Sequence, residues 1–144
     1  MFDGRYLKGF LLVGLALSLG GCDSPTLVSI AITPNAEYFG GTSGQAQFTA
    51  IGTFDQGNHP KTTQDITDEV TWKSNAPAVA TVSSTGLVSV TGQATGITNI
   101  TASMNGFTGL IIATATAEVC PVNYTPTSTG CTAPSSGSGA ISRR

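Results

Sequence analysis

The residues that could carry chemistry are few and far apart in this sequence. His59 is the only histidine among 144 residues, and it lies in a Gly-Asn-His-Pro stretch that is typical of a loop. A Ser–His–Asp unit would need that histidine as its base. The sequence holds no G-x-S-x-G elbow, phosphate-binding loop or metal-ligand cluster. We therefore expect a protein that is not an enzyme, with no catalytic residue, no metal site and no cofactor.

Four acidic residues form the one cluster of charged side chains that could bind a cation. They are Asp55, Asp65, Asp68 and Glu69. Calcium takes six to eight oxygen ligands, and carboxylates on one loop can supply some of them. The spacing does not match an EF-hand, and the same residue types are typical of turns and caps in a solvated loop. A weak cation-binding loop is therefore a hypothesis beside that plainer interpretation.

The first 21 residues are typical of an export signal. Two basic side chains precede an apolar run at residues 9–19, and small residues follow it. This run is shorter than the 18 or so apolar residues that a membrane-spanning helix needs. A charged start, a short apolar stretch and small residues at the end together predict a signal peptide that is removed after export.

The end of that signal predicts a lipid anchor. The residues Leu-Gly-Gly-Cys that end at Cys22 resemble the lipobox of bacterial lipoproteins. The resemblance implies cleavage before Cys22, lipidation of its thiol, and a tether at residues 22–26 that connects the lipid to the rest of the chain. Two or three acyl chains hold a protein stably at a membrane. We therefore expect a protein of the bacterial cell envelope, on a periplasmic or cell-surface face, with the membrane as one partner.

The two other cysteines predict a disulfide. If lipid occupies Cys22, then Cys120 and Cys131 remain as an even pair in an oxidising compartment. Their spacing is not C-x-x-C, and a single histidine makes a metal site a poor alternative. Closing a loop of this length would stabilise the fold by about 3 kcal/mol.

Composition and pattern predict one all-β domain. Charged residues make up 10% of the chain and the net charge is −2, so no electrostatic argument for nucleic-acid binding exists. Short alternating segments are separated by turn residues. We predict about seven strands, at residues 27–33, 45–54, 69–74, 78–83, 87–91, 97–104 and 107–119, with a brief extended piece at 36–39 and a polar loop at 55–68. Beyond them, residues 120–144 have the Pro, Ser, Thr and Gly content of a flexible tail.

The aromatic residues divide into core and surface candidates. Trp72 shares a face with Val70 in a predicted strand, so we place both in the core of the sandwich. Tyr38, Phe39 and Phe107 lie near turns and are the better candidates for exposed rings.

Strand number and turn spacing fit an immunoglobulin-like β-sandwich over residues 27–119. Sequence blocks across this range resemble the bacterial Ig-like domain of group 2, found in intimin- and invasin-type surface proteins. The best blocks are Val28–Pro34, Asp65–Trp72, Ser74–Val82, Gly86–Val88 and Ala94–Gly96 with Ile100–Ala102. The resemblance implies an Ig-like fold and a role in adhesion or as a spacer.

The predicted function is that of a membrane-anchored lipoprotein whose Ig-like domain is a non-catalytic protein-interaction, adhesion or structural module. Because the tether is short, an envelope protein or glycan near the membrane is a better partner than a distant receptor. A partner strand added to an open sheet edge is one physical route. A carbohydrate-binding module, which would need coplanar exposed aromatic rings, is the alternative.

Overall fold

The computed structural model describes residues 24–135, and within this range it is built of strands and turns. The predicted signal peptide at 1–21, the lipidation candidate Cys22 and tail residues 136–144 lie outside the described residues. In the described part, no helix has the length and apolar character needed to cross a bilayer. The strands are β1 (Thr26–Thr33), β2 (Ala36–Gly40), β3 (Gln45–Gln47), β4 (Thr49–Gln56), β5 (His59–Asp65), β6 (Thr71–Ser74), β7 (Ala80–Val82), β8 (Leu87–Val90), β9 (Gly96–Gly106), β10 (Gly109–Cys120), β11 (Thr125–Thr127) and β12 (Gly130–Thr132).

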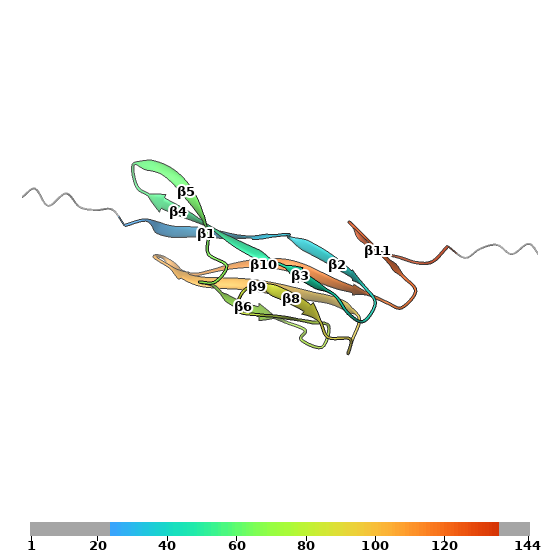
Figure 1. Cartoon of the computed structure of the whole chain (residues 1–144). Coiled ribbons are helices and arrows are strands. Elements are labelled where there is room, and N and C mark those ends of the chain that lie inside the picture. Colours follow the sequence, from blue (N-terminus) through green and yellow to red (C-terminus); the bar gives the residue numbers. More distant parts are fainter. Residues whose placement is uncertain (1–23, 136–144) are drawn as a thin grey trace, which may run out of the picture.

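Two layers of strands face each other. One layer has the order β2-β10-β9-β6, and the other combines β1-β4-β5 with β3-β8-β7. The strands β3 and β4 are almost continuous, interrupted at Phe48, whose N–H donates to the Gly86 carbonyl oxygen at 2.9 Å. All strand pairs are antiparallel except β2 with β10. Figure 1 shows the strands running along one long axis, with the start of β1 at one end and β11 at the other. The predicted all-β, immunoglobulin-like fold class is confirmed.

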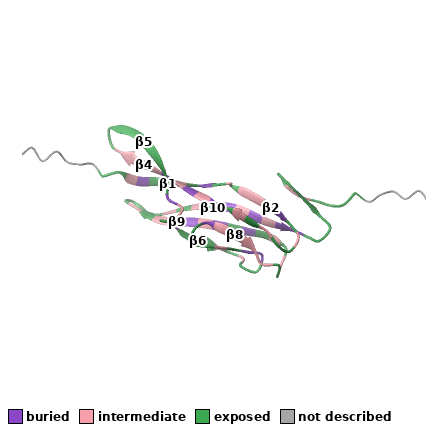
Figure 2. Ribbon diagram, in the orientation of Figure 1, coloured by how far each residue is buried: buried purple, intermediate pink, exposed green. Residues whose placement is uncertain are grey.

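The core lies between the layers because the central strands turn their apolar faces inward. On β9 and β10, buried Ile100 pairs with buried Ala115, and Ala102 pairs with Ala113. Figure 2 shows the buried positions along these inner faces. The fully buried side chains of largest volume are Phe48, Ile66, Ile100, Val88, Val119, Thr98 and Cys120. Alternation with a period of two residues is therefore the pattern that places the core.

Trp72 and Val70 are core residues, as the sequence predicts. Val70 is buried, and the half-buried ring of Trp72 packs against the core cluster. The indole N–H of Trp72 donates to the Thr67 carbonyl oxygen at 2.9 Å, which satisfies its single polar atom. Phe39 differs from the prediction: its ring is buried, because residue 39 pairs with Val119 on the inner face of β10.

The one buried polar side chain in the described part is Thr98, and it has a full set of partners. Its hydroxyl donates to Asn75 Oδ1 at 3.0 Å, accepts from the Ala76 N–H at 3.1 Å and lies 2.8 Å from Ser74 Oγ. A buried hydroxyl is costly only when it is unpaired. This network therefore fixes the chain just after β6 without an energetic penalty.

Two elements occupy segments that were expected to be irregular. The strand β5 lies inside the predicted polar loop at 55–68, so that prediction is wrong for His59–Asp65. Every residue of β5 is exposed, so backbone pairing with β4 forms the strand and no apolar alternation marks it. The hairpin β11–β12 lies inside the predicted tail at 120–144, where the sequence indicated no strands.

We expect Ile100→Ala to lower the free energy of unfolding by about 3 kcal/mol, because its side chain is 0% exposed. The control is Ile97→Ala, since Ile97 lies on the same strand with its side chain 61% exposed. The control should change stability by less than about 0.5 kcal/mol. Urea unfolding followed by Trp72 fluorescence measures both, and equal losses would refute the assignment of the two faces of β9.

Candidate functional site

Three of the four predicted acidic residues lie together at the surface. Asp65, Asp68 and Glu69 line one shallow hollow of about 410 Å³. Its remaining lining is polar and comes from Gln47, Thr49, Thr67 and Thr85. The hollow is open and has no enclosed apolar wall, so it lacks the features of a small-molecule pocket.

Asp65 organises the turn that follows β5. Its Oδ1 accepts hydrogen bonds from the Thr67 N–H at 2.9 Å and the Thr67 hydroxyl at 2.6 Å. These two hydrogen bonds lower the pKa of Asp65. The same Thr67 hydroxyl oxygen accepts from the Ala50 N–H at 2.9 Å, and the Thr67 carbonyl accepts from the Trp72 indole. The carboxylate of Asp65 is therefore part of a structural network that connects β4, the turn and the core tryptophan.

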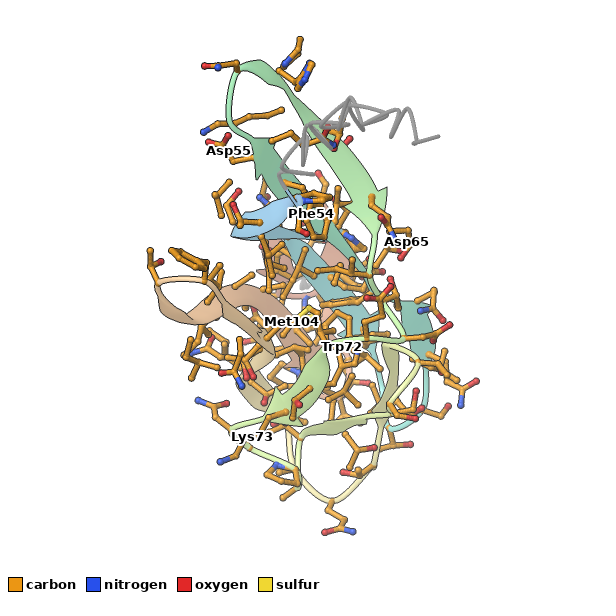
Figure 3. The ribbon with its side chains drawn as sticks, turned by 90° about the vertical axis from the view of Figure 1, so that its left-hand side faces the viewer. Phe54, Asp55, Asp65, Trp72, Lys73 and Met104 are labelled. Carbon is orange, nitrogen blue, oxygen red and sulfur yellow. A yellow bond between two sulfur atoms is a disulfide. The ribbon has the colours of Figure 1, made fainter. Side chains whose placement is uncertain are left out.

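Asp55 is not part of this hollow. Asp65 pairs with Ile51 on β4, and Asp55 lies four residues further along that strand, at roughly 3.4 Å per residue. Its carboxylate accepts from the Gly57 N–H at 2.9 Å and lies 3.7 Å from Lys61 Nζ. Figure 3 shows Asp55 and Asp65 well apart on the β4–β5 hairpin.

The cation-binding hypothesis has little geometric support. Among residues 24–135, no group of three or more His, Cys, Asp or Glu side chains is arranged to hold a metal ion. One oxygen of the Asp65 carboxylate, Oδ1, already accepts two hydrogen bonds from Thr67. The only histidine, His59, is exposed at the start of β5, next to the turn of the β4–β5 hairpin. Turn chemistry explains these side chains.

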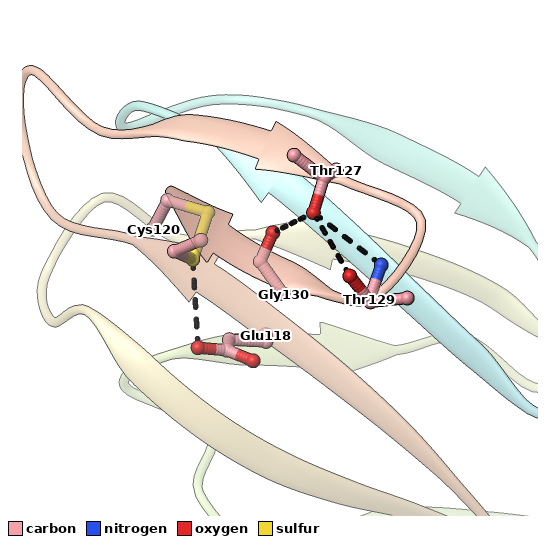
Figure 4. The surroundings of a disulfide bond; sticks show 6 residues. Glu118, Cys120, Thr127, Thr129 and Gly130 are labelled. Atoms are coloured by element: carbon pink, nitrogen blue, oxygen red, sulfur yellow. Dashed lines mark hydrogen bonds between the residues drawn. A yellow bond between two sulfur atoms is a disulfide. The ribbon is translucent and has the colours of Figure 1, made fainter. Parts of the chain in front are cut away.

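The structure joins Cys120 and Cys131 in a disulfide, the pair that the sequence analysis puts together. Cys120 is buried at the end of β10, and Cys131 lies in β12. The bond therefore attaches the β11–β12 hairpin to the sandwich (Figure 4). Within the hairpin, Thr127 Oγ1 donates to the Gly130 carbonyl oxygen at 2.8 Å. Glu118 Oε1 lies 3.4 Å from Cys131 Sγ. This is a non-bonded contact, because a disulfide sulfur carries no hydrogen.

The β11–β12 hairpin covers the edge of one layer. Its strand β11 contacts β2, the edge strand of the β2-β10-β9-β6 layer. The pyrrolidine ring of Pro126 lies over Gly40, where a Cβ atom would come within 3.1 Å of the ring. Glycine at position 40 therefore permits this close approach, which sequence reasoning missed because the hairpin itself was not predicted.

Two edge strands of the sheets, β5 and β6, carry features that discourage strand addition. The edge strand β5 contains Pro60 and Lys61, and the edge strand β6 has four residues and carries Lys73. Proline, lysine and short length are the means by which natural sheets protect their edges. A partner strand added at these edges is therefore less favourable than the sequence alone suggested.

The outward face of β9 and β10 carries little charge. Thr114 and Thr101 lie opposite each other, as do Ile112 and Ser103. The Thr101 hydroxyl donates to the Lys73 carbonyl oxygen at 3.3 Å, so part of its hydrogen-bonding capacity is already used. Neutral hydroxyl, amide and aliphatic side chains predominate here, which suits contact with another protein surface better than binding of a charged ligand.

The exposed aromatic rings of the described part do not form a platform. Phe107 is 87% exposed and precedes β10, whereas Tyr124 is 41% exposed and follows it. They lie at opposite ends of a strand of 12 residues, which spans roughly 40 Å. Coplanar stacking of one sugar chain on both rings is not available in this arrangement.

Comparison with known proteins gives a family match and a relative. The model of the family described as bacterial Ig-like domain (group 2) matches residues 28–110. Ice-binding protein 1 of Shewanella frigidimarina (strain NCIMB 400) is 44% identical over 95 residues, which cover 57% of this chain and 10% of that protein. The chain therefore spans about a tenth of the length of the curated relative it matches.

We expect Asp65→Asn to destabilise the protein at neutral pH more than Asp68→Asn, which removes the same charge from the same hollow. The pKa of Asp65 is lower in the folded protein, so its stabilising contribution is present above the unfolded-state pKa of about 4 and is lost as pH falls through the folded-state pKa. The midpoints of urea unfolding between pH 3 and pH 7 measure how the stability of the parent protein and of both variants depends on pH. The difference between the parent protein and Asp65→Asn should shrink in acid; a difference independent of pH would contradict the role of the carboxylate.

We expect reduction of the disulfide to release the β11–β12 hairpin and to lower the free energy of unfolding by up to about 3 kcal/mol. The reason is that the bond closes a loop with a sequence separation of 11. Limited proteolysis with and without reductant locates the effect, and urea unfolding measures its size. Cleavage should begin within residues 121–135 while the sandwich stays intact. Unchanged proteolysis after complete reduction would show that contacts other than the disulfide hold the hairpin.

Proposed function

This chain belongs to the family of bacterial Ig-like domains of group 2, and on that premise we propose that it is a lipid-anchored, non-catalytic module of the bacterial cell envelope. The observation that carries the proposal is the short distance in sequence between the lipidation candidate and the first strand of the domain. Cys22, with its lipobox-like neighbours, stands four positions before Thr26, where β1 of the family domain begins. A lipid on Cys22 would thus attach almost directly to a folded domain.

The proposed module acts through surface contacts. Its hollow is open and polar, and its only buried polar side chain in the described part serves the fold. The outward face of β9 and β10, which carries little charge, offers an area for a protein partner. An interface needs such an area with few charges at its centre.

The tether limits which partners the domain can reach. The four residue-to-residue steps from Cys22 to Thr26 extend at most about 14 Å. A lipidated domain would therefore remain within a few nanometres of the membrane surface. This reach favours neighbouring envelope proteins, or a structural role beside them, over adhesion to a distant receptor.

Two other functions have weaker support. Glycan binding is the alternative, but the exposed rings of Phe107 and Tyr124 lie at opposite ends of the domain. The relative from Shewanella frigidimarina is named for ice binding, and the chain matches about a tenth of it.

We expect Cys22→Ser to abolish incorporation of labelled palmitate and to move the protein from the membrane fraction to the soluble fraction. The control is Cys131→Ser, which also removes one sulfur atom but leaves the lipobox unchanged, and it should keep the label. Labelling of the expressed full chain, followed by membrane fractionation, measures both. Palmitate retained in Cys22→Ser would refute the proposed anchor.

A further inference from the structure

An apolar hairpin tip projects from one end of the domain. Phe107 and Thr108 form the turn between β9 and β10, because Gly106 pairs with Gly109. The ring of Phe107 is 87% exposed, and the side chains of Leu110 and Ile112 are 61% and 58% exposed. These three residues, here called the hairpin tip, leave a large apolar area in water that the fold does not use.

This tip lies at the end of the domain where the chain enters it. A Cβ atom at Gly106 would come within 2.8 Å of the Leu27 carbonyl oxygen, so the β9–β10 hairpin contacts the start of β1. Figure 1 shows the start of β1, the β4–β5 hairpin and the β9–β10 hairpin at the same end, and Figure 3 looks onto that end. The five residues from Cys22 to Leu27 span at most about 18 Å.

We propose that the hairpin tip inserts into the interfacial region of the bilayer that holds the lipid on Cys22. The inference rests on the proposed anchor and adds an orientation to it: the β9–β10 tip faces the membrane. The short tether would bring the lipid surface within reach of Phe107. Transfer of exposed apolar area from water into that region is favourable in proportion to the area buried.

The rest of this end suits the same orientation. The neighbouring β4–β5 hairpin carries Asp55 and Lys61 with Nζ 3.7 Å from Oδ2, and polar groups of this kind are compatible with lipid headgroups. The opposite end carries exposed Val122 and Tyr124, which lie a full β10 length from the tether, roughly 40 Å away. Those residues supply a matched control for the test.

The experiment uses two variants of the lipidated chain, each with one added tryptophan, at opposite ends of the domain. Phe107→Trp and Val122→Trp are prepared from membranes and reconstituted into phosphatidylcholine vesicles with brominated or ordinary acyl chains. Bromine quenches only rings that reach the acyl region. Trp72, half-buried and hydrogen-bonded to Thr67, provides a background that the parent chain measures. Palmitate labelling of each preparation reports the anchor separately.

We expect loss of fluorescence from bromine for Phe107→Trp and little loss beyond the parent for Val122→Trp. Equal quenching of the two variants in chains that carry lipid would overturn the inference and leave the anchor standing. A parent chain that carries no lipid would overturn the proposed function and, with it, this orientation. Both substitutions are at exposed positions, so neither should prevent folding.

Discussion

Close packing between the β9–β10 pair and the facing layer is the interaction on which the rest of the structure depends. The inner face of these two strands carries small side chains, among them Ala102, Ala115 and Ala117, which are essentially unexposed. They belong to the same core cluster as the large side chain of Phe48. Small residues opposite large ones let two sheets approach closely without voids. Once this face is buried, the outward positions of the same strands are fixed as well.

The sequence predicted well those elements whose stability comes from this core. Alternation marked β1 and β8–β10. The prediction placed Trp72 correctly from the apolar residue two positions before it, Val70, and both residues contact the core. The strand β5 could not be found in this way, because all of its residues are exposed and only backbone hydrogen bonds hold it. Phe39 was misplaced because its position near a turn outweighed a parallel pairing with β10 that the sequence does not display.

The candidate sites show a similar division. Carboxylates adjacent in sequence, Asp65, Asp68 and Glu69, do line one hollow. Asp55 was grouped with them on the expectation of one continuous loop, and the extended β4–β5 hairpin separates them instead. Sequence patterns also could not reveal that the N–H and the hydroxyl of Thr67 both donate hydrogen bonds to the Asp65 carboxylate. That hydrogen bond depends on a turn whose geometry is set by the buried neighbours on either side.

The parallel pairing of β2 with β10 has a mechanical consequence. The two strands meet through five register pairs, from Ala36–Thr116 to Gly40–Cys120. The chain enters β2 from β1 and leaves β10 toward β11, and these two connections lie at opposite ends of the paired segment. A force that pulls those ends apart draws β2 and β10 in opposite directions along their common axis. The pairs are then loaded together in shear rather than opened one after another. A module held at a membrane at one end and by a partner at the other could therefore bear tension, with its lifetime set by the barrier to forced unfolding.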